Sequence, residues 1–356
     1  MFSSLITRTQ EASMIRPCQK FEGHSNFLEG IIHLLGRQWM MTCSRDGSLR
    51  VWNLKSGKQI GEDWQDGDSG VWTLIALSLD GKEVVSRSLD GAVRLWDIDT
   101  GKVIAKWTGH TQPVKSVCWS RDGQQVVSRS EDGTAREWDV ENRETIVGPI
   151  ETGHEDVFIV IYSPDMIMFV TSGYDSWPNH GNTECAVKIW NAKTGVLVAT
   201  LKGHTDLVVC LAWTPNGKTL ISGSVDSSIR TWNTSNQIAV LDGHTESVYG
   251  IAISPNGHVL TSASRDKTAR LWNLNDNQPI SSPLNYANTI TVMSFSADGK
   301  LLATCCDDKS MYTWDVSAIL EEAGLDDLLL DKPIKASPWV CQGLFDNTQH
   351  HAHVRC

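Results

Sequence analysis

The chain repeats an aspartate and a tryptophan at a fixed spacing, and this repeat limits the folds open to it. Asp is followed six residues later by Trp at six places, and at a seventh place, Asp175 and Trp190, nine further residues lie between them. Successive repeat aspartates lie 44, 42, 43, 51, 40 and 42 positions apart, and the 51 becomes 42 without those nine residues. A period of about 40 residues indicates an array of equal supersecondary units. We therefore expect seven such units.

Each repeat carries further landmarks before its aspartate. A Gly-His pair places its His 21 or 22 residues before the Asp in five repeats, and a Ser or Thr lies four residues before the Asp in all seven. Between these landmarks, apolar and polar residues alternate and are interrupted by turn sequences such as SLDGK and TPNGK. Such alternation between turn signals predicts short antiparallel strands, about four in each repeat.

These landmarks resemble those of the WD-repeat family, and the resemblance extends over residues 14–316. It implies an all-β fold, a single seven-bladed β-propeller with four strands in each blade. Local stretches such as DKTARLWNL are also similar to the WD-repeat arrays of fungal NACHT-type receptor proteins. The phosphate-binding pattern GxxxxGK[ST] of a nucleotide hydrolase is absent from this sequence.

The seventh repeat lacks its fourth strand. After Trp314 the apolar residues follow a helical spacing instead of an alternating one. The segment 14–22 precedes the first Gly-His pair just as an outer strand precedes the others. We expect this segment to pair with blade seven and close the ring. Residues 1–13 are then a disordered N-terminus, and residues 317–356 form a short C-terminal helix and a flexible tail.

Composition argues against several classes of function. The 42 acidic and 31 basic residues give a net charge of −11, which opposes binding to the phosphates of nucleic acids. The longest apolar run has seven residues, too few to cross a membrane. Nine cysteines without a regular spacing indicate free thiols in a reducing compartment. We expect a cytoplasmic protein, with a nuclear location left open, that binds neither nucleic acid nor membranes.

His, Ser or Thr, and Asp recur together, and these are the residue types of a hydrolase triad. The repeat tryptophan argues against catalysis, because its indole N–H would donate to the hydroxyl oxygen that a nucleophile must keep free. The family resemblance implies a structural tetrad at the same positions. We therefore expect no catalytic residue, no metal and no cofactor. The five full tetrads are His24, Thr42, Asp46 and Trp52; His110, Ser128, Asp132 and Trp138; His154, Thr171, Asp175 and Trp190; His204, Ser222, Asp226 and Trp232; and His244, Ser262, Asp266 and Trp272.

The resemblance also implies that protein partners bind the variable positions of the top face. In blades four to six these positions are mostly apolar or aromatic, which is typical of a partner-binding patch. The predicted patch consists of Val157, Ile159, Tyr174, Leu207, Val209, Val225 and Tyr249, with Trp177 in the nine-residue insertion and Arg265 at the border. The alternative is that these side chains lean into the central channel and are merely packed. We predict a non-catalytic scaffold for proteins or peptides, a monomeric ring within larger complexes.

Two further hypotheses concern ligands. Arg87 and Arg129 occupy a strand position where the other repeats have small residues, and Glu137 shares its side of the sheet. These three residues either pair to join two blades, as buried charges require, or leave Arg87 to bind a phosphate or carboxylate. The alternative function is a recognition module for a small ligand or carbohydrate, with Phe27, Trp72 and Trp177 as stacking surfaces.

Overall fold

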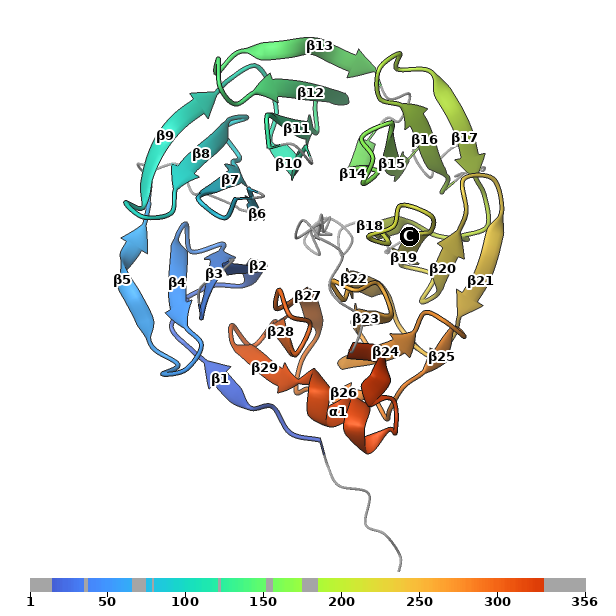
Figure 1. Ribbon diagram of the computed structural model, residues 1–356. Helices are drawn as coiled ribbons and strands as arrows, with labels where there is room; N and C mark the ends of the chain where they lie inside the picture. The colour runs from blue at the N-terminus through green and yellow to red at the C-terminus, as the bar shows by residue number, and fades with distance from the viewer. Residues whose placement is uncertain are drawn as a thin grey trace, which may run out of the picture.

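The computed structural model describes residues 15–34, 38–65, 75–78, 80–120, 123–151, 156–174 and 185–329. In these residues the strands form seven antiparallel sheets around a ring, so the predicted seven-bladed propeller is confirmed (Figure 1). The first strand of each blade lies toward the centre of the ring and the last strand lies at the rim. A ligand or partner could therefore bind either face of the ring or its rim.

The first four blades each contain four consecutive strands. Blade one consists of β2 (Leu28–Leu34), β3 (Trp39–Ser44), β4 (Leu49–Asn53) and β5 (Gln59–Trp64). Blade two consists of β6 (Ile75–Leu77), β7 (Glu83–Arg87), β8 (Val93–Asp97) and β9 (Lys102–Trp107). Blade three consists of β10 (Val114–Trp119), β11 (Gln125–Ser130), β12 (Thr134–Asp139) and β13 (Thr145–Glu151). Blade four consists of β14 (Asp156–Tyr162), β15 (Met168–Tyr174), β16 (Val187–Asn191) and β17 (Leu197–Leu201).

The last three blades include two departures from this plan. Blade five consists of β18 (Val208–Trp213), β19 (Leu220–Ser224), β20 (Ile229–Trp232) and β21 (Gln237–Leu241). Blade six consists of β22 (Val248–Ile253), β23 (Val259–Ser264) and β24 (Thr268–Asn273), and its outer strand is split into β25 (Gln278–Pro279) and β26 (Leu284–Asn285). Blade seven consists of β27 (Ile290–Phe295), β28 (Leu301–Cys306), β29 (Met311–Asp315) and the early strand β1 (Gln19–Phe21).

The hydrophobic core lies between neighbouring blades. One cluster joins Val170 and Ile189 of blade four to Trp213 and Leu220 of blade five, and all four side chains are buried. Burying a large apolar side chain contributes roughly 1.5–3 kcal/mol. Each blade therefore depends on its neighbours for much of its stability.

The pairing of β1 with β29 closes the ring, as the missing strand of the seventh repeat predicts. Gln19 is opposite Thr313 and Phe21 is opposite Met311 in this antiparallel pair. Phe21 is only 2% exposed, and its ring meets that of Trp52 in blade one edge to face, with centroids 6.1 Å apart. One short strand thus completes blade seven and also contacts blade one.

The segment after blade seven packs against the ring. Helix α1 (Val316–Glu322) begins at Asp315, whose carboxylate accepts a hydrogen bond of 3.0 Å from the backbone N–H of Ala318. Leu320 of this helix and Leu328 of the short 3-10 helix η2 (Asp326–Leu329) are buried in a cluster shared by blades six and seven. No helix in the described part of the chain has the length and apolar character to span a bilayer. The predicted disordered N-terminus and flexible tail lie outside the described residues.

Removing the aromatic ring of Phe21 should weaken the closure. We expect Phe21→Ala to lower the free energy of unfolding by about 3–5 kcal/mol, because the change leaves a cavity between two blades. The neighbouring exposed residue provides the control, since Lys20→Ala should change the stability by no more than roughly 0.5 kcal/mol. Urea denaturation followed by tryptophan fluorescence measures both values. Equal stability of the two variants would mean that β1 does not hold the ring closed.

Candidate functional site

The His, hydroxyl and Asp of a repeat meet in the structure together with its Trp. In blade five, Nδ1 of His204 lies 2.8 Å from a carboxylate oxygen of Asp226, and Nε2 lies 2.7 Å from the hydroxyl of Ser222. Nε1 of Trp232 donates to the same hydroxyl at 2.8 Å. The carboxylate also accepts a hydrogen bond of 3.0 Å from the backbone N–H of Thr205. The four side chains thus form one continuous hydrogen-bonded chain.

The same arrangement recurs in blades one, three and six, with every bond of the chain between 2.7 and 2.9 Å. In blade four, Trp190 donates to Thr171 at 2.8 Å. The other two members of that predicted tetrad, His154 and Asp175, lie outside the described residues.

The tetrads have a structural role. Their hydrogen bonds join neighbouring strands, and their hydroxyl groups are not accessible to a substrate. Ser222 is completely buried and its oxygen already accepts the indole N–H. Burial lowers the pKa of His204 more than the neighbouring Asp226 raises it, so the ring is held neutral. A neutral ring can donate from Nδ1 to the carboxylate and accept from the hydroxyl at Nε2. Each polar side-chain group of this tetrad then has a hydrogen-bond partner.

Blade two has no His at this position, and an arginine supplies the missing donor. The Nη1 and Nη2 atoms of Arg94 lie 3.2 and 2.8 Å from the two carboxylate oxygens of Asp90, and Arg94 is only 1% exposed. Trp96 still donates to Ser86 at 2.8 Å. A bidentate contact of this kind is among the stronger ion pairs in proteins.

Blade seven replaces the His with two tyrosines. The hydroxyl of Tyr286 lies 2.9 Å from that of Thr304, and the hydroxyl of Tyr312 donates to Asp308 at 2.6 Å. The hydrogen bond from Trp314 to Thr304 is longer here, at 3.3 Å. The two blades that depart from the repeat therefore keep partners for their aspartates by different means.

The predicted top-face patch is mostly buried. Val157, Ile159 and Leu207 are 0% exposed, Val209 is 1% exposed and Tyr249 is 5% exposed. The prediction of an exposed patch is wrong for these five residues, and the alternative of packed side chains describes them. Leu207, Val209 and Tyr249 form one buried cluster with Cys185. Val225 packs against this cluster.

Two members of that predicted patch do reach the surface. Val225 is partly exposed and Arg265 is exposed. The side chain of Tyr174 and the whole of Trp177 lie outside the described residues.

The two arginines of the predicted cluster are buried and Glu137 is partly buried, and Arg87 joins three blades rather than two. Its Nη1 donates to the carbonyl of Val114 in blade three at 3.1 Å, and its Nη2 lies 3.9 Å from a carboxylate oxygen of Glu29 in blade one. The sequence pattern did not pair Glu29 with Arg87; Glu29 is 3% exposed and also pairs with Arg45. Burial, with the charge of Glu29, raises the pKa of the nearby Asp307 to about 6.

The other two members of the cluster contact blade four. The guanidinium of Arg129 lies over the ring of Phe158, with its carbon 5.9 Å from the ring centroid, and Tyr162 donates to the carboxylate of Glu137 at 3.2 Å. Both contacts join blade three to blade four, and the pairing of Arg87, Arg129 and Glu137 with one another stays a prediction. Among the described residues, no group of three or more His, Cys, Asp or Glu is placed to hold a metal.

Sequence analysis also missed a set of exposed apolar side chains at the rim. Val196 is 61% exposed, Val198 and Ile238 are each 53% exposed, and Val240 is 36% exposed. Val198 and Ile238 occupy the same place in the outer strands β17 and β21 of blades four and five, one residue after the partner of the tetrad Trp. The apolar run IAVL at 238–241 is compatible with a strand, but it does not show which side of that strand faces solvent.

Comparison with known proteins gives the repeats a family. A sequence model described as "WD domain, G-beta repeat" matches residues 15–53, 101–139, 195–233, 235–273 and 279–315, together more than half of the chain. The resemblance to NACHT-type receptor arrays stays a prediction.

Curated relatives share the repeats over part of their length. The chain is 30% identical to WD repeat-containing protein srw1 of Schizosaccharomyces pombe over 125 residues, which is 35% of this chain and 21% of the relative. It is 43% identical to the anaphase-promoting complex subunit cdh1 of Dictyostelium discoideum over 54 residues, 15% of this chain and 7% of the relative. It is 25% identical to mouse Striatin-4 over 216 residues, 61% of this chain and 22% of the relative. The chain thus spans less than a quarter of each of these proteins.

Removing one tetrad carboxylate should destabilise its blade. We expect Asp226→Ala to leave the N–H groups of His204 and Thr205 without an acceptor, at about 1–3 kcal/mol for each group. The exposed Asp242 provides the control, and Asp242→Ala should change the stability by no more than roughly 0.5 kcal/mol. Urea denaturation measures both. A loss no larger than that of the control would show that the chain of hydrogen bonds does not stabilise the blade.

Acidification should destabilise the ring in two steps. Burial lowers the pKa of His110 and His204 from the ordinary 6.5, so the unfolded state binds these protons first and stability falls as the pH drops below about 6.5. Burial raises the pKa of Asp226, but the interactions with His204 and Ser228 together lower it more, so the net value is below the ordinary 3.8 and a second loss follows below about pH 3.8. Each proton changes the slope by about 1.4 kcal/mol per pH unit.

Denaturant titrations from pH 8 to lower values test this dependence. The double variant His110→Gln and His204→Gln should have a smaller slope between about pH 6.5 and 5 than the wild type. A wild-type stability that rises on acidification over the same interval would contradict the neutral assignment of the two rings.

Proposed function

We propose that this chain, which belongs to the WD domain, G-beta repeat family, is a non-catalytic scaffold that binds segments of other proteins. The tetrads are enclosed and their polar atoms have partners, so they support the ring without offering a reactive group. One relative is named as a subunit of the anaphase-promoting complex. Its name supports an assembly role here by analogy alone.

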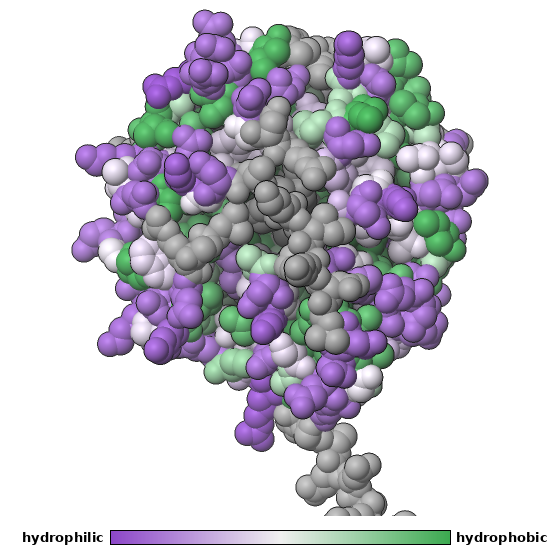
Figure 2. Space-filling model, viewed as in Figure 1, coloured by the Kyte–Doolittle hydropathy of each residue, from purple (hydrophilic) through white to green (hydrophobic). Residues whose placement is uncertain are grey.

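The observation that carries this proposal is the apolar rim of blades four and five. Val196, Val198 and Ile238 are more than half exposed. Val198 belongs to the outer strand β17, which Val196 immediately precedes, and Ile238 belongs to β21; these two strands lie one after the other along the rim (Figure 1). Figure 2 shows hydrophobic residues at the rim among hydrophilic ones. Neighbouring exposed apolar side chains favour a binding surface for a protein.

The edges of these strands offer a second kind of contact. Each outer strand is the last of its sheet, and among the residues that the structure describes no strand pairs with its outer side. An extended segment of a partner can add to such an edge through main-chain hydrogen bonds, while apolar side chains provide affinity. We propose that the partner segment lies along β17 or β21 and covers Val198 or Ile238.

The proposal includes the top face of blades four to six. Arg265 is exposed and Val225 is partly exposed, and Val225 packs against the buried cluster of Leu207, Val209 and Tyr249. A packed apolar cluster of this kind restricts the movement of Val225. A partner that contacts both surfaces would reach from the rim onto the top face.

Two pairs of substitutions separate the surfaces. We expect Val198→Asp with Ile238→Asp to abolish capture of proteins from a native extract, because charges oppose an apolar interface. Val225→Asp with Arg265→Glu tests the top face in the same assay. Leu89→Asp, at a 39% exposed apolar residue in blade two, is the control and should capture the same proteins as the wild type.

Circular dichroism and thermal unfolding must first show that all variants are folded. Loss of the same protein from one double variant, with retention by the control, supports a scaffold that uses that surface. Capture of the same proteins by the wild type and both double variants would overturn the proposal for blades four to six.

A further inference from the structure

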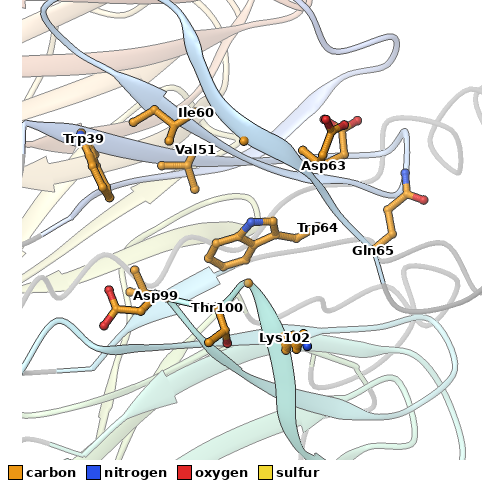
Figure 3. Close-up of a pocket in the computed structure, with 13 residues that line it drawn as sticks. Trp39, Val51, Ile60, Asp63, Trp64, Gln65, Asp99, Thr100 and Lys102 are labelled. Carbon is orange, nitrogen blue, oxygen red and sulfur yellow. The ribbon is translucent and has the colours of Figure 1, made fainter.

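A cavity of about 580 Å3 lies at the rim between blades one and two (Figure 3). One wall consists of Trp39, Val51 and Ile60 of blade one, and the opposite wall is the turn between β8 and β9 of blade two. The ring of Trp64 lies between these walls. This volume falls within the range of about 300–1,000 Å3 that is typical of small-molecule sites.

An irregularity in the outer strand of blade one accompanies the cavity. Val51 pairs with Ile60 and Leu49 pairs with Trp64, so residues 61–63 of β5 are opposite a single residue of β4. The bulge includes Gly61, whose φ of +69° suits glycine. Bulges of this kind redirect the side chains that follow them.

Blade two shows the same position without a bulge. Trp107 of β9 pairs with Val93 in a regular stretch, is only 3% exposed and stacks on Trp138 of the next blade with centroids 6.2 Å apart. Trp64 likewise stacks on Trp96 at 6.3 Å, yet it is partly exposed. Two equivalent tryptophans thus differ in access to solvent, and the accessible one lines the cavity.

The charges around the cavity favour a neutral ligand. Asp63 is already engaged by Arg50 at 2.9 Å and by Gln59 at 2.8 Å. The exposed Glu62 and Asp99 would repel a phosphate or carboxylate, and the exposed Lys102 would repel an ammonium group. A purely apolar ligand would cover these charged groups without hydrogen bonds, which is unfavourable.

We propose that this cavity binds a neutral saccharide of one or two pyranose rings. The accessible faces of Trp39 and Trp64 pack against the C–H faces of the sugar, and Glu62 and Lys102 hydrogen-bond its hydroxyl groups. Sugar rings present an apolar face and a polar edge, which matches a cavity with an aromatic floor and a polar rim. The site lies in blades one and two and is independent of the protein-binding surfaces proposed for blades four to six.

The sequence predicted Phe27, Trp72 and Trp177 as the aromatic residues of a carbohydrate site, whereas the site proposed here uses Trp39 and Trp64. Phe27 is 40% exposed but is not among the residues that line this cavity. Trp72 and Trp177 lie outside the described residues.

Calorimetric titration with cellobiose, maltose and N,N′-diacetylchitobiose, each alone at millimolar concentration, tests the proposal. We expect at least one of these disaccharides to bind with one-to-one stoichiometry and to change the tryptophan fluorescence. Trp39→Ala should weaken that binding at least about tenfold, a factor that corresponds to about 1.4 kcal/mol. Phe27→Ala, which removes an exposed aromatic ring elsewhere, should bind as the wild type does.

A pair of glycine substitutions tests the cavity without removing an aromatic ring. A Cβ at Gly101 would lie 2.6 Å from Nε1 of Trp64, whereas a Cβ at Gly195, in blade four, would meet nothing within 4 Å. Both glycines have a φ of +66°, so alanine causes the same backbone strain at either position. Gly101→Ala should displace Trp64 and weaken binding, and Gly195→Ala should not.

Two results would overturn the proposal. One is the absence of binding by all three disaccharides. The other is equal affinity of folded wild-type protein, Trp39→Ala and Gly101→Ala, which would place any bound sugar elsewhere on the ring. Thermal unfolding of each variant establishes that it is folded before titration.

Discussion

The hydrogen bond from the tryptophan indole to a buried hydroxyl is the interaction on which every blade depends. It occurs in all seven blades, from Trp52, Trp96, Trp138, Trp190, Trp232, Trp272 and Trp314. The tetrad His is absent from blades two and seven. Arg94 in blade two and two tyrosines in blade seven supply the hydrogen-bond donors instead. The indole places a large apolar ring between blades and binds the neighbouring strand at the same time. Donors for the aspartate can vary as long as that contact remains.

The fold could be predicted because repetition supplies the same information seven times. A period near 40 residues with a missing last strand is enough to expect a closed ring, and the pairing of Phe21 with Met311 agrees with it. Exposure could not be predicted in the same way. Val157 and Leu207 occupy positions that vary between repeats, yet both are completely buried, and Leu207 packs in a cluster with residues of the neighbouring blades. Contacts between blades are not encoded in a single repeat.

The candidate site residues show the same limit. The strand position of Arg87 correctly predicts a buried charge. Its carboxylate partner, however, is Glu29 of blade one, about 60 residues earlier, and these two residues come close only in the folded ring. The cavity beside Trp64 depends on two extra residues in β5, which in the sequence look like any other polar stretch before a turn. Local irregularities can therefore create sites that a repeat pattern conceals.

The closing strand also sets the order in which the molecule can be completed. Gln19 emerges from the ribosome before any blade, yet its partner Thr313 belongs to the last blade to be made. Six blades can pack against one another during synthesis, but the edge of β29 stays open until β1 reaches it across a long loop. During this interval β1 and the uncovered side of Trp52 are exposed to other strands. A nascent ring of this design has a period of vulnerability to pairing with a neighbouring chain, which ends only when the first strand meets the last.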